Sequence, residues 1–83
     1  MRLKTDRQIK DFQELVDTCV GNVYLISPDR SDFFNLRSTF SQYIAIDKLL
    51  SNADIDWEVH ASDVTDQMRI NKFLEKLAAE NNK

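Results

Sequence analysis

The stretch of sequence that decides the fold is Ile55-Asp56-Trp57-Glu58-Val59-His60-Ala61-Ser62. Apolar and polar residues alternate along it, which is typical of a β-strand with one face on a core and the other in water. It holds the only Trp and the only His of the chain. The rest of the chain must therefore supply the elements that cover the face carrying Trp57.

Composition limits the class of protein. The chain has 83 residues, 42% hydrophobic and 30% charged, as expected for a single globular domain over residues 1–83. Its net charge is −3 and it has no basic stripe, which argues against nucleic-acid binding. It has no apolar run of the roughly 18–20 residues that span a membrane. A single cysteine excludes an internal disulfide, so we expect a soluble cytoplasmic protein.

Hydrophobic spacing predicts the order of the elements. The expected strands are near residues 1–5, 22–27, 33–36 and 55–62, and the expected helices near residues 6–20, 38–51 and 63–79. The order β-α-β-β-α-β-α favours an α+β fold, an open-faced two-layer sandwich with three helices on one face of a four-stranded antiparallel sheet. A ferredoxin-like fold with an added C-terminal helix is the alternative.

Local signals mark where the helices begin and end. Thr5 opens a capping box with the glutamine three residues later, and Ser62 or Asp63 caps the last helix. Gly21 is expected to end the first helix with a positive φ. A loop near 51–54 leads back to the Trp57 strand.

The predicted core centres on Trp57. Five further residues on apolar faces are expected to be buried with it: Phe12, Val16, Leu25, Phe73 and Leu77. Cys19 lies on the apolar stripe of the first helix, and we expect it to behave as a small buried hydrophobic residue.

Two segments resemble a known family. Phe34-Asn35-Leu36-Arg37-Ser38-Thr39-Phe40 and residues 55–63 are similar to two segments of the histidine-containing phosphocarrier protein of the sugar phosphotransferase system. The first is similar to the strand-to-helix junction around the family's regulatory serine, and the second to its last strand. The resemblance covers nearly the whole chain, including the order and spacing of the elements. It implies the family's open-faced sandwich and a regulatory phosphorylation at Ser38.

The family's phosphorylated histidine has no counterpart here. The family carries it in a His-Ala-Arg-Pro-like motif, where this chain has Lys4-Thr5-Asp6-Arg7-Gln8. Arg7 stands near the family's arginine and is a candidate anion contact. A phosphoryl carrier needs a nitrogen nucleophile at a helix N-terminus, where backbone N–H groups hold the phosphate. We therefore expect no carrier chemistry at this position.

His60 is the most conspicuous candidate for chemistry outside the resemblance. It stands between Glu58 and Ser62 on the polar face of the strand. An open sheet face gives such a row no oxyanion donors and does not exclude water, so we expect no catalytic residue here and no enzyme. One His and one Cys on different elements match no metal-ligand spacing, and Asp29 and Asp32 fit a turn, so no metal or cofactor is expected.

The helix near 38–51 carries more apolar surface than one face needs. Phe40, Tyr43 and Ile44 match the family's apolar helix patch, through which partner proteins dock. Aromatic residues are also enriched in protein interfaces. The competing interpretation is that these side chains complete the core. Ser38 also has two interpretations, because it is either the regulatory phosphorylation site that the resemblance implies or simply the N-cap of this helix.

Three functional hypotheses follow. The first is a small non-catalytic protein-interaction or regulatory module with a phosphocarrier-like fold, whose partner is another protein. The second is a phosphocarrier or phosphotransfer protein of the sugar phosphotransferase system that uses His60 or an aspartate. The third is a homodimer that associates through the apolar helix near 38–51.

Overall fold

The computed structural model describes residues 1–51 and 55–82. Within them the elements are α1 (Asp6–Asp17), β1 (Val23–Ile26), β2 (Phe33–Asn35), α2 (Thr39–Ser51), β3 (Glu58–Ala61) and α3 (Val64–Asn81). These bounds agree with the predicted helices and with the last three predicted strands to within a few residues. Most of the predicted loop near 51–54 lies outside the described residues.

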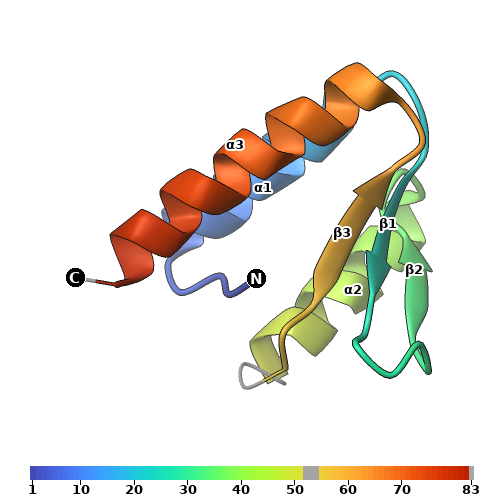
Figure 1. Ribbon diagram of the computed structural model, residues 1–83. Coiled ribbons are helices and arrows are strands. Elements are labelled where there is room, and N and C mark those ends of the chain that lie inside the picture. Colours follow the sequence, from blue (N-terminus) through green and yellow to red (C-terminus); the bar gives the residue numbers. More distant parts are fainter. Residues whose placement is uncertain (52–54, 83) are drawn as a thin grey trace.

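The fold is α+β, with three helices and a three-stranded antiparallel sheet in the order β2-β1-β3 (Figure 1). Val23, Leu25 and Val59 point into the core, whereas Glu58 and His60 point to the open face. The predicted alternation around Trp57 therefore holds, although β3 itself begins one residue later. None of the helices in the described ranges is long and apolar enough to cross a lipid bilayer.

The predicted first strand near residues 1–5 is not formed, so the sheet has three strands where the sequence predicted four. Helical side chains bind the main chain of this segment: Gln8 Oε1 accepts the Lys4 N–H at 2.7 Å, and Asn81 Nδ2 donates to the Arg2 carbonyl at 2.9 Å. Leu3 is buried in the core. At the start of the segment, the Met1 nitrogen donates to the Trp57 carbonyl at 3.2 Å.

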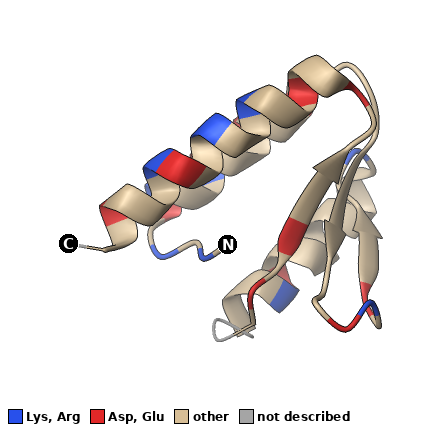
Figure 2. Ribbon diagram, viewed as in Figure 1, with Lys and Arg blue, Asp and Glu red and all other residues tan. Residues whose placement is uncertain are grey.

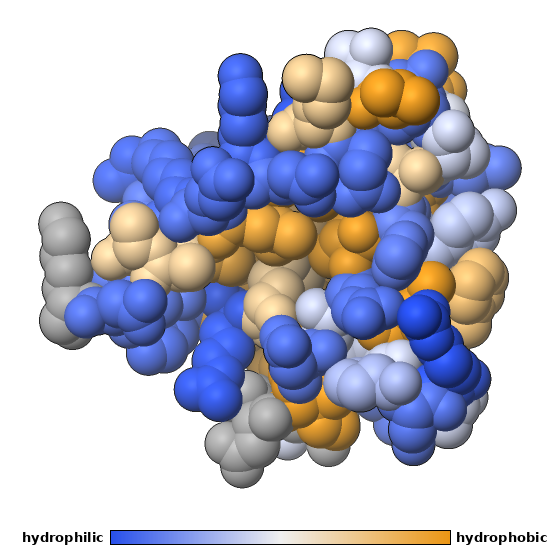
Figure 3. All heavy atoms as spheres, in the orientation of Figure 1, coloured by the Kyte–Doolittle hydropathy of each residue, from blue (hydrophilic) through white to orange (hydrophobic). Residues whose placement is uncertain are grey.

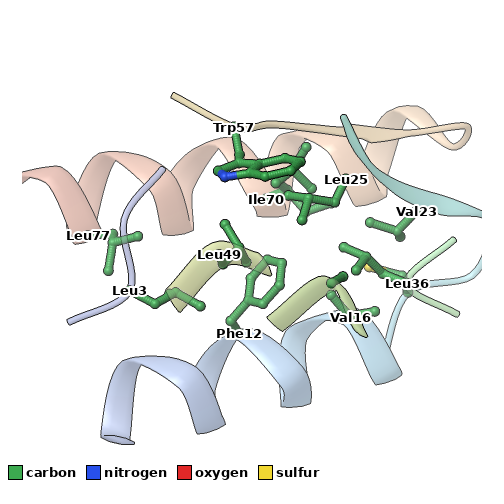
Figure 4. Packing of buried hydrophobic residues seen from close by; sticks show 13 residues of the cluster. Leu3, Phe12, Val16, Val23, Leu25, Leu36, Leu49, Trp57, Ile70 and Leu77 are labelled. Atoms are coloured by element: carbon green, nitrogen blue, oxygen red, sulfur yellow. The ribbon is translucent and has the colours of Figure 1, made fainter. Parts of the chain in front are cut away.

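The core lies between the sheet and the helices, and Figure 4 shows the Trp57 indole above Leu49 and Phe12. Trp57 is 3% exposed. Of the six predicted core residues, five are buried: Trp57, Phe12, Val16, Leu25 and Leu77. Phe73 is only partly buried, packed with its ring 5.9 Å from that of Phe12.

Capping follows the predicted positions in part. Thr5 Oγ1 accepts the Gln8 N–H at 3.1 Å, and Asp63 caps α3 by accepting the Asp66 N–H at 3.0 Å. The prediction for Gly21 was wrong, since no glycine has a positive φ. Glycine is needed there for space instead, because a Cβ would lie 2.6 Å from Ser62 Oγ.

Arg37 ties α1 to the start of α2. Its Nη1 donates to three carbonyls at the C-terminal end of α1, those of Val16, Asp17 and Cys19, at 2.7–3.2 Å. A cation at this end of a helix also interacts favourably with the helix dipole. The junction that carries Ser38 and Phe40 is therefore held against the end of α1.

Candidate functional site

The exposed face of α2 carries the residues predicted to bind a partner. Phe40, Tyr43 and Ile44 are 75%, 67% and 38% exposed, and their spacing of three and four places them on one helix face. The opposite face anchors α2 to the core through Ala45, Ile46 and Leu49. We call Phe40, Tyr43 and Ile44 the α2 patch.

Leu50 extends the α2 patch by one more apolar side chain. It is 48% exposed and follows Tyr43 by seven residues, which is about two helical turns. The sequence did not single it out, because the helix is apolar on several sides and the pattern does not show which side faces the core. Its neighbour Leu49 is buried, so the boundary between the core and the exposed face runs between these two leucines.

Ser38 lies directly before α2, in the N-cap position. Its backbone carbonyl accepts the Gln42 N–H at 2.8 Å, as the first bond of a helix requires. Among the described residues its hydroxyl makes no hydrogen bond, and the side chain is exposed. The serine is thus accessible at the positive end of a helix dipole, two residues before Phe40 in the sequence.

Arg7 is not brought near Ser38. It lies in the first turn of α1, whereas Arg37 holds the Ser38 junction at the other end of that helix. A helix of 12 residues is about 18 Å long at 1.5 Å per residue. The Arg7 guanidinium is also 3.8 Å from the Asp11 carboxylate, which would repel an anion bound there.

The row of Glu58, His60 and Ser62 is only partly formed. His60 Nε2 is 3.2 Å from Glu58 Oε2, and Arg30 Nη2 is 3.3 Å from the same oxygen. Ser62 Oγ instead accepts the Asn22 N–H at 3.0 Å. His60 therefore has a carboxylate neighbour but no hydroxyl nucleophile beside it.

The remaining candidate groups have structural partners. Cys19 is buried, and burial is the main cause that raises the pKa of its thiol above the ordinary 9.0. Asp29 accepts hydrogen bonds from Ser31 and Ser27 in the turn, chiefly the Ser31 hydroxyl, and these lower the pKa of its carboxyl below 3.8. Within the described residues, no three His, Cys, Asp or Glu side chains gather closely enough to hold a metal ion.

A groove separates β3 from α3 and was not predicted from the sequence. Its volume is about 800 Å³, and its walls come from the N-terminal segment, the outer edge of β3 and one face of α3. Hydrophobic atoms lie recessed between hydrophilic rims on this side of the molecule (Figure 3). The only sequence signal is on α3, where Gln67, Asn71 and Leu74 recur at spacings of four and three.

Comparison with known proteins returned no match: no protein-family model, curated protein or solved structure matches this chain.

Proposed function

We propose that this protein is a small non-catalytic interaction or regulatory module with a phosphocarrier-like fold, and that it docks another protein through the α2 patch. The observation that carries the proposal is the exposure of Phe40 and Tyr43 on a helix whose other face is fixed in the core. Exposed aromatic side chains on a rigid element desolvate a large area with little rotamer entropy to lose. A core role does not explain either ring.

Regulation by phosphorylation belongs to the same proposal. A phosphate on Ser38 would stand at the N-terminus of α2, where the dipole favours negative charge. It would also stand beside the α2 patch, so that the added charge changes docking directly. The exposed hydroxyl without a hydrogen-bond partner among the described residues supports this role.

The alternative hypothesis, a phosphocarrier, has weaker support. His60 lies in the middle of a strand, away from any helix N-terminus that could hold a phosphate. Its Nε2 also lies 3.2 Å from Glu58 Oε2, so this ring nitrogen is already engaged. Incubation with phosphoenolpyruvate and the general phosphotransferase components tests it, because an added phosphate on intact protein that disappears in His60→Gln would favour the carrier.

The docking proposal is tested by affinity capture from a lysate of the source organism, followed by titration of the purified partner. The bait proteins are wild type, Phe40→Ala, Tyr43→Ala and the control Val64→Ala, which removes an equally exposed apolar side chain from α3. We expect each aromatic variant to weaken the partner by about 2 kcal/mol or more, roughly thirtyfold, while Val64→Ala leaves the affinity unchanged.

Three outcomes contradict the docking proposal. One is equal capture of the same partner by all four proteins. The second is a loss of binding in Phe40→Ala that follows a loss of its cooperative melt. The third is self-association of the purified wild type through α2 in analytical ultracentrifugation, which would favour the homodimer hypothesis instead.

A further inference from the structure

The outer edge of β3 has backbone groups that no strand pairs. In the β1–β3 ladder, Ser62 donates to the Asn22 carbonyl, so Glu58 and His60 are the residues of β3 whose backbone groups face β1. The N–H and C=O groups of Val59 and Ala61 therefore face away from the sheet. Such an edge is a ready template for another strand.

A side-chain amide occupies part of this edge as a peptide group of another strand would. Gln67 Oε1 accepts the Ala61 N–H at 2.8 Å, and Gln67 Nε2 donates to the Val59 carbonyl at 3.3 Å. The Met1 nitrogen donates to the Trp57 carbonyl at 3.2 Å. The Val59 N–H has no acceptor among the described residues. The edge therefore offers strand-like hydrogen bonds that α3 satisfies only in part.

The groove along this edge has the form of a site for an extended chain. Its volume of about 800 Å³ is in the range of ligand pockets. Leu74, Leu77 and Ala78 supply apolar surface on the α3 side, and Asn71 adds an amide. An extended peptide requires both kinds of contact. Its backbone requires amide partners, and its alternate side chains require apolar surface.

The charges of the groove favour an acidic occupant. Both carboxylates at its rim already have a cationic partner, Asp56 the Met1 ammonium at 3.0 Å and Glu58 the Arg30 guanidinium at 3.3 Å. Arg2 and Lys4 also line the groove, and neither has an acidic partner within the described residues. Figure 2 shows Lys and Arg positions in blue along the N-terminal segment.

Trp57 adds an unsatisfied donor at the same place. Trp57 is among the residues that line the groove, and its Nε1 is buried without a hydrogen-bond partner among the described residues. The nitrogen edge of the ring points toward the end of the molecule where Leu3 and Leu77 lie (Figure 4). An oxygen of a bound chain is the type of acceptor that this N–H lacks.

We infer that this groove binds an extended, acidic peptide segment of a partner protein, which adds a strand to the outer edge of β3. One residue of the segment pairs with Val59, displacing the long bond from Gln67. An apolar side chain of the segment lies on Leu74 and Ala78, and an acidic one lies beside Arg2 and Lys4. The site is separate from the α2 patch and does not depend on it.

The test selects short random peptides, displayed on phage, for binding to the whole wild-type protein. We expect the recovered peptides to alternate apolar residues and to be enriched in Asp and Glu. Ala78→Trp should weaken their binding at least about tenfold by filling the groove. Ala79→Trp is the matched control, since Ala79 is the adjacent exposed alanine outside the groove.

Charge reversal supplies a second test that does not depend on filling the groove. Lys4→Glu should weaken the same peptides at least about tenfold, whereas Lys72→Glu, an equal change outside the groove, should not. In hydrogen exchange, a bound peptide should slow exchange of the Val59 amide. Because Lys4 lies outside the helices and strands, this variant keeps the test decisive even if Ala78→Trp does not fold.

Each of three results overturns the inference. The first is that the selection recovers no peptide that binds wild type better than Ala78→Trp. The second is that the recovered peptides bind undiminished to Lys4→Glu or leave exchange at Val59 unchanged. The third is that their binding is lost in Phe40→Ala but kept in Ala78→Trp, which would assign the peptides to the α2 patch and support docking there alone.

Discussion

Asp66 is a buried charged side chain that joins two segments, the turn after α1 and the start of α3. It is 1% exposed, and its carboxylate accepts the N–H groups of Val20 and Gly21 at 2.8–3.1 Å. The bond from Gly21 is the largest cause that holds the pKa of this carboxyl below its ordinary 3.8, against the opposing effect of burial. The carboxylate thereby fixes the turn after α1 against the first turn of α3.

Asp66→Asn should destabilise the protein, because the new amide N–H groups would face the donors of Val20 or Gly21. The folded-state pKa of Asp66 is lowered, so its stabilisation is present above the unfolded pKa and is lost as pH falls through the folded one. The gap in melting temperature between wild type and variant should therefore be full at neutral pH and narrow below about pH 4. Asp17→Asn, the same change at an exposed position, is the control, and a gap independent of pH would contradict the assignment.

Gly21→Ala tests the close approach between the turn after α1 and Ser62. The added Cβ would lie 2.6 Å from Ser62 Oγ, which cannot rotate away without losing its bond from Asn22. We expect a loss of about 1–3 kcal/mol in urea unfolding, as for other overpacked sites.

Removal of the hydroxyl gives the matching control. In the double variant Gly21→Ala/Ser62→Ala, the clash is relieved, so the loss should be smaller than the sum of the two single losses. Strictly additive losses would show that the clash is not the reason for glycine at this position.

At the scale of elements, the boundary of α2 with the core gives a prediction on two adjacent residues. Leu49→Ala should cost about 2–5 kcal/mol, because the side chain is 4% exposed and leaves a cavity. Leu50→Ala should change stability by less than about 0.5 kcal/mol, because that side chain is already half in water. Chemical denaturation measures both, and equal losses would mean that α2 packs differently.

The elements that were predicted correctly are those whose sequence patterns lie within a short stretch of the chain. The alternation at Trp57, the caps at Thr5 and Asp63 and the hairpin of β1 and β2 each depend on residues within a few positions of one another. These signals identify the element type directly. Pairing between distant segments leaves no such signal.

The segment near residues 1–5 shows that limit. Leu3 has the inward position expected of a strand, but the main chain around it is bound by Gln8 and Asn81, which lies far away in the sequence. The groove could not be predicted for the same reason, since its walls combine this segment, β3 and α3, which are distant in the sequence. The exposure of Phe40 and Tyr43 also depends on which side of α2 meets the core, which the apolar pattern left open.

For the whole molecule, Trp57 is the residue whose truncation should most reduce the stability of the fold. Trp57→Ala should cost about 3–5 kcal/mol, which is near the whole stability expected for a core of this size. Thermal unfolding should then lose its cooperative transition. Trp57→Phe keeps an aromatic ring in the core and should retain a transition, and a cooperative melt of Trp57→Ala close to that of wild type would contradict the central place of the indole.

The strand order β2-β1-β3 also determines when the chain can fold during its synthesis. The central strand β1 meets β2 early, but its other neighbour, β3, follows α2. A two-stranded hairpin is marginal in water, and domains fold as units. A nascent chain of which only the residues up to Ser51 have emerged from the ribosome should therefore stay unfolded and protease-sensitive, exposing the apolar side chains of β1 and α2 to chaperones until β3 and α3 emerge.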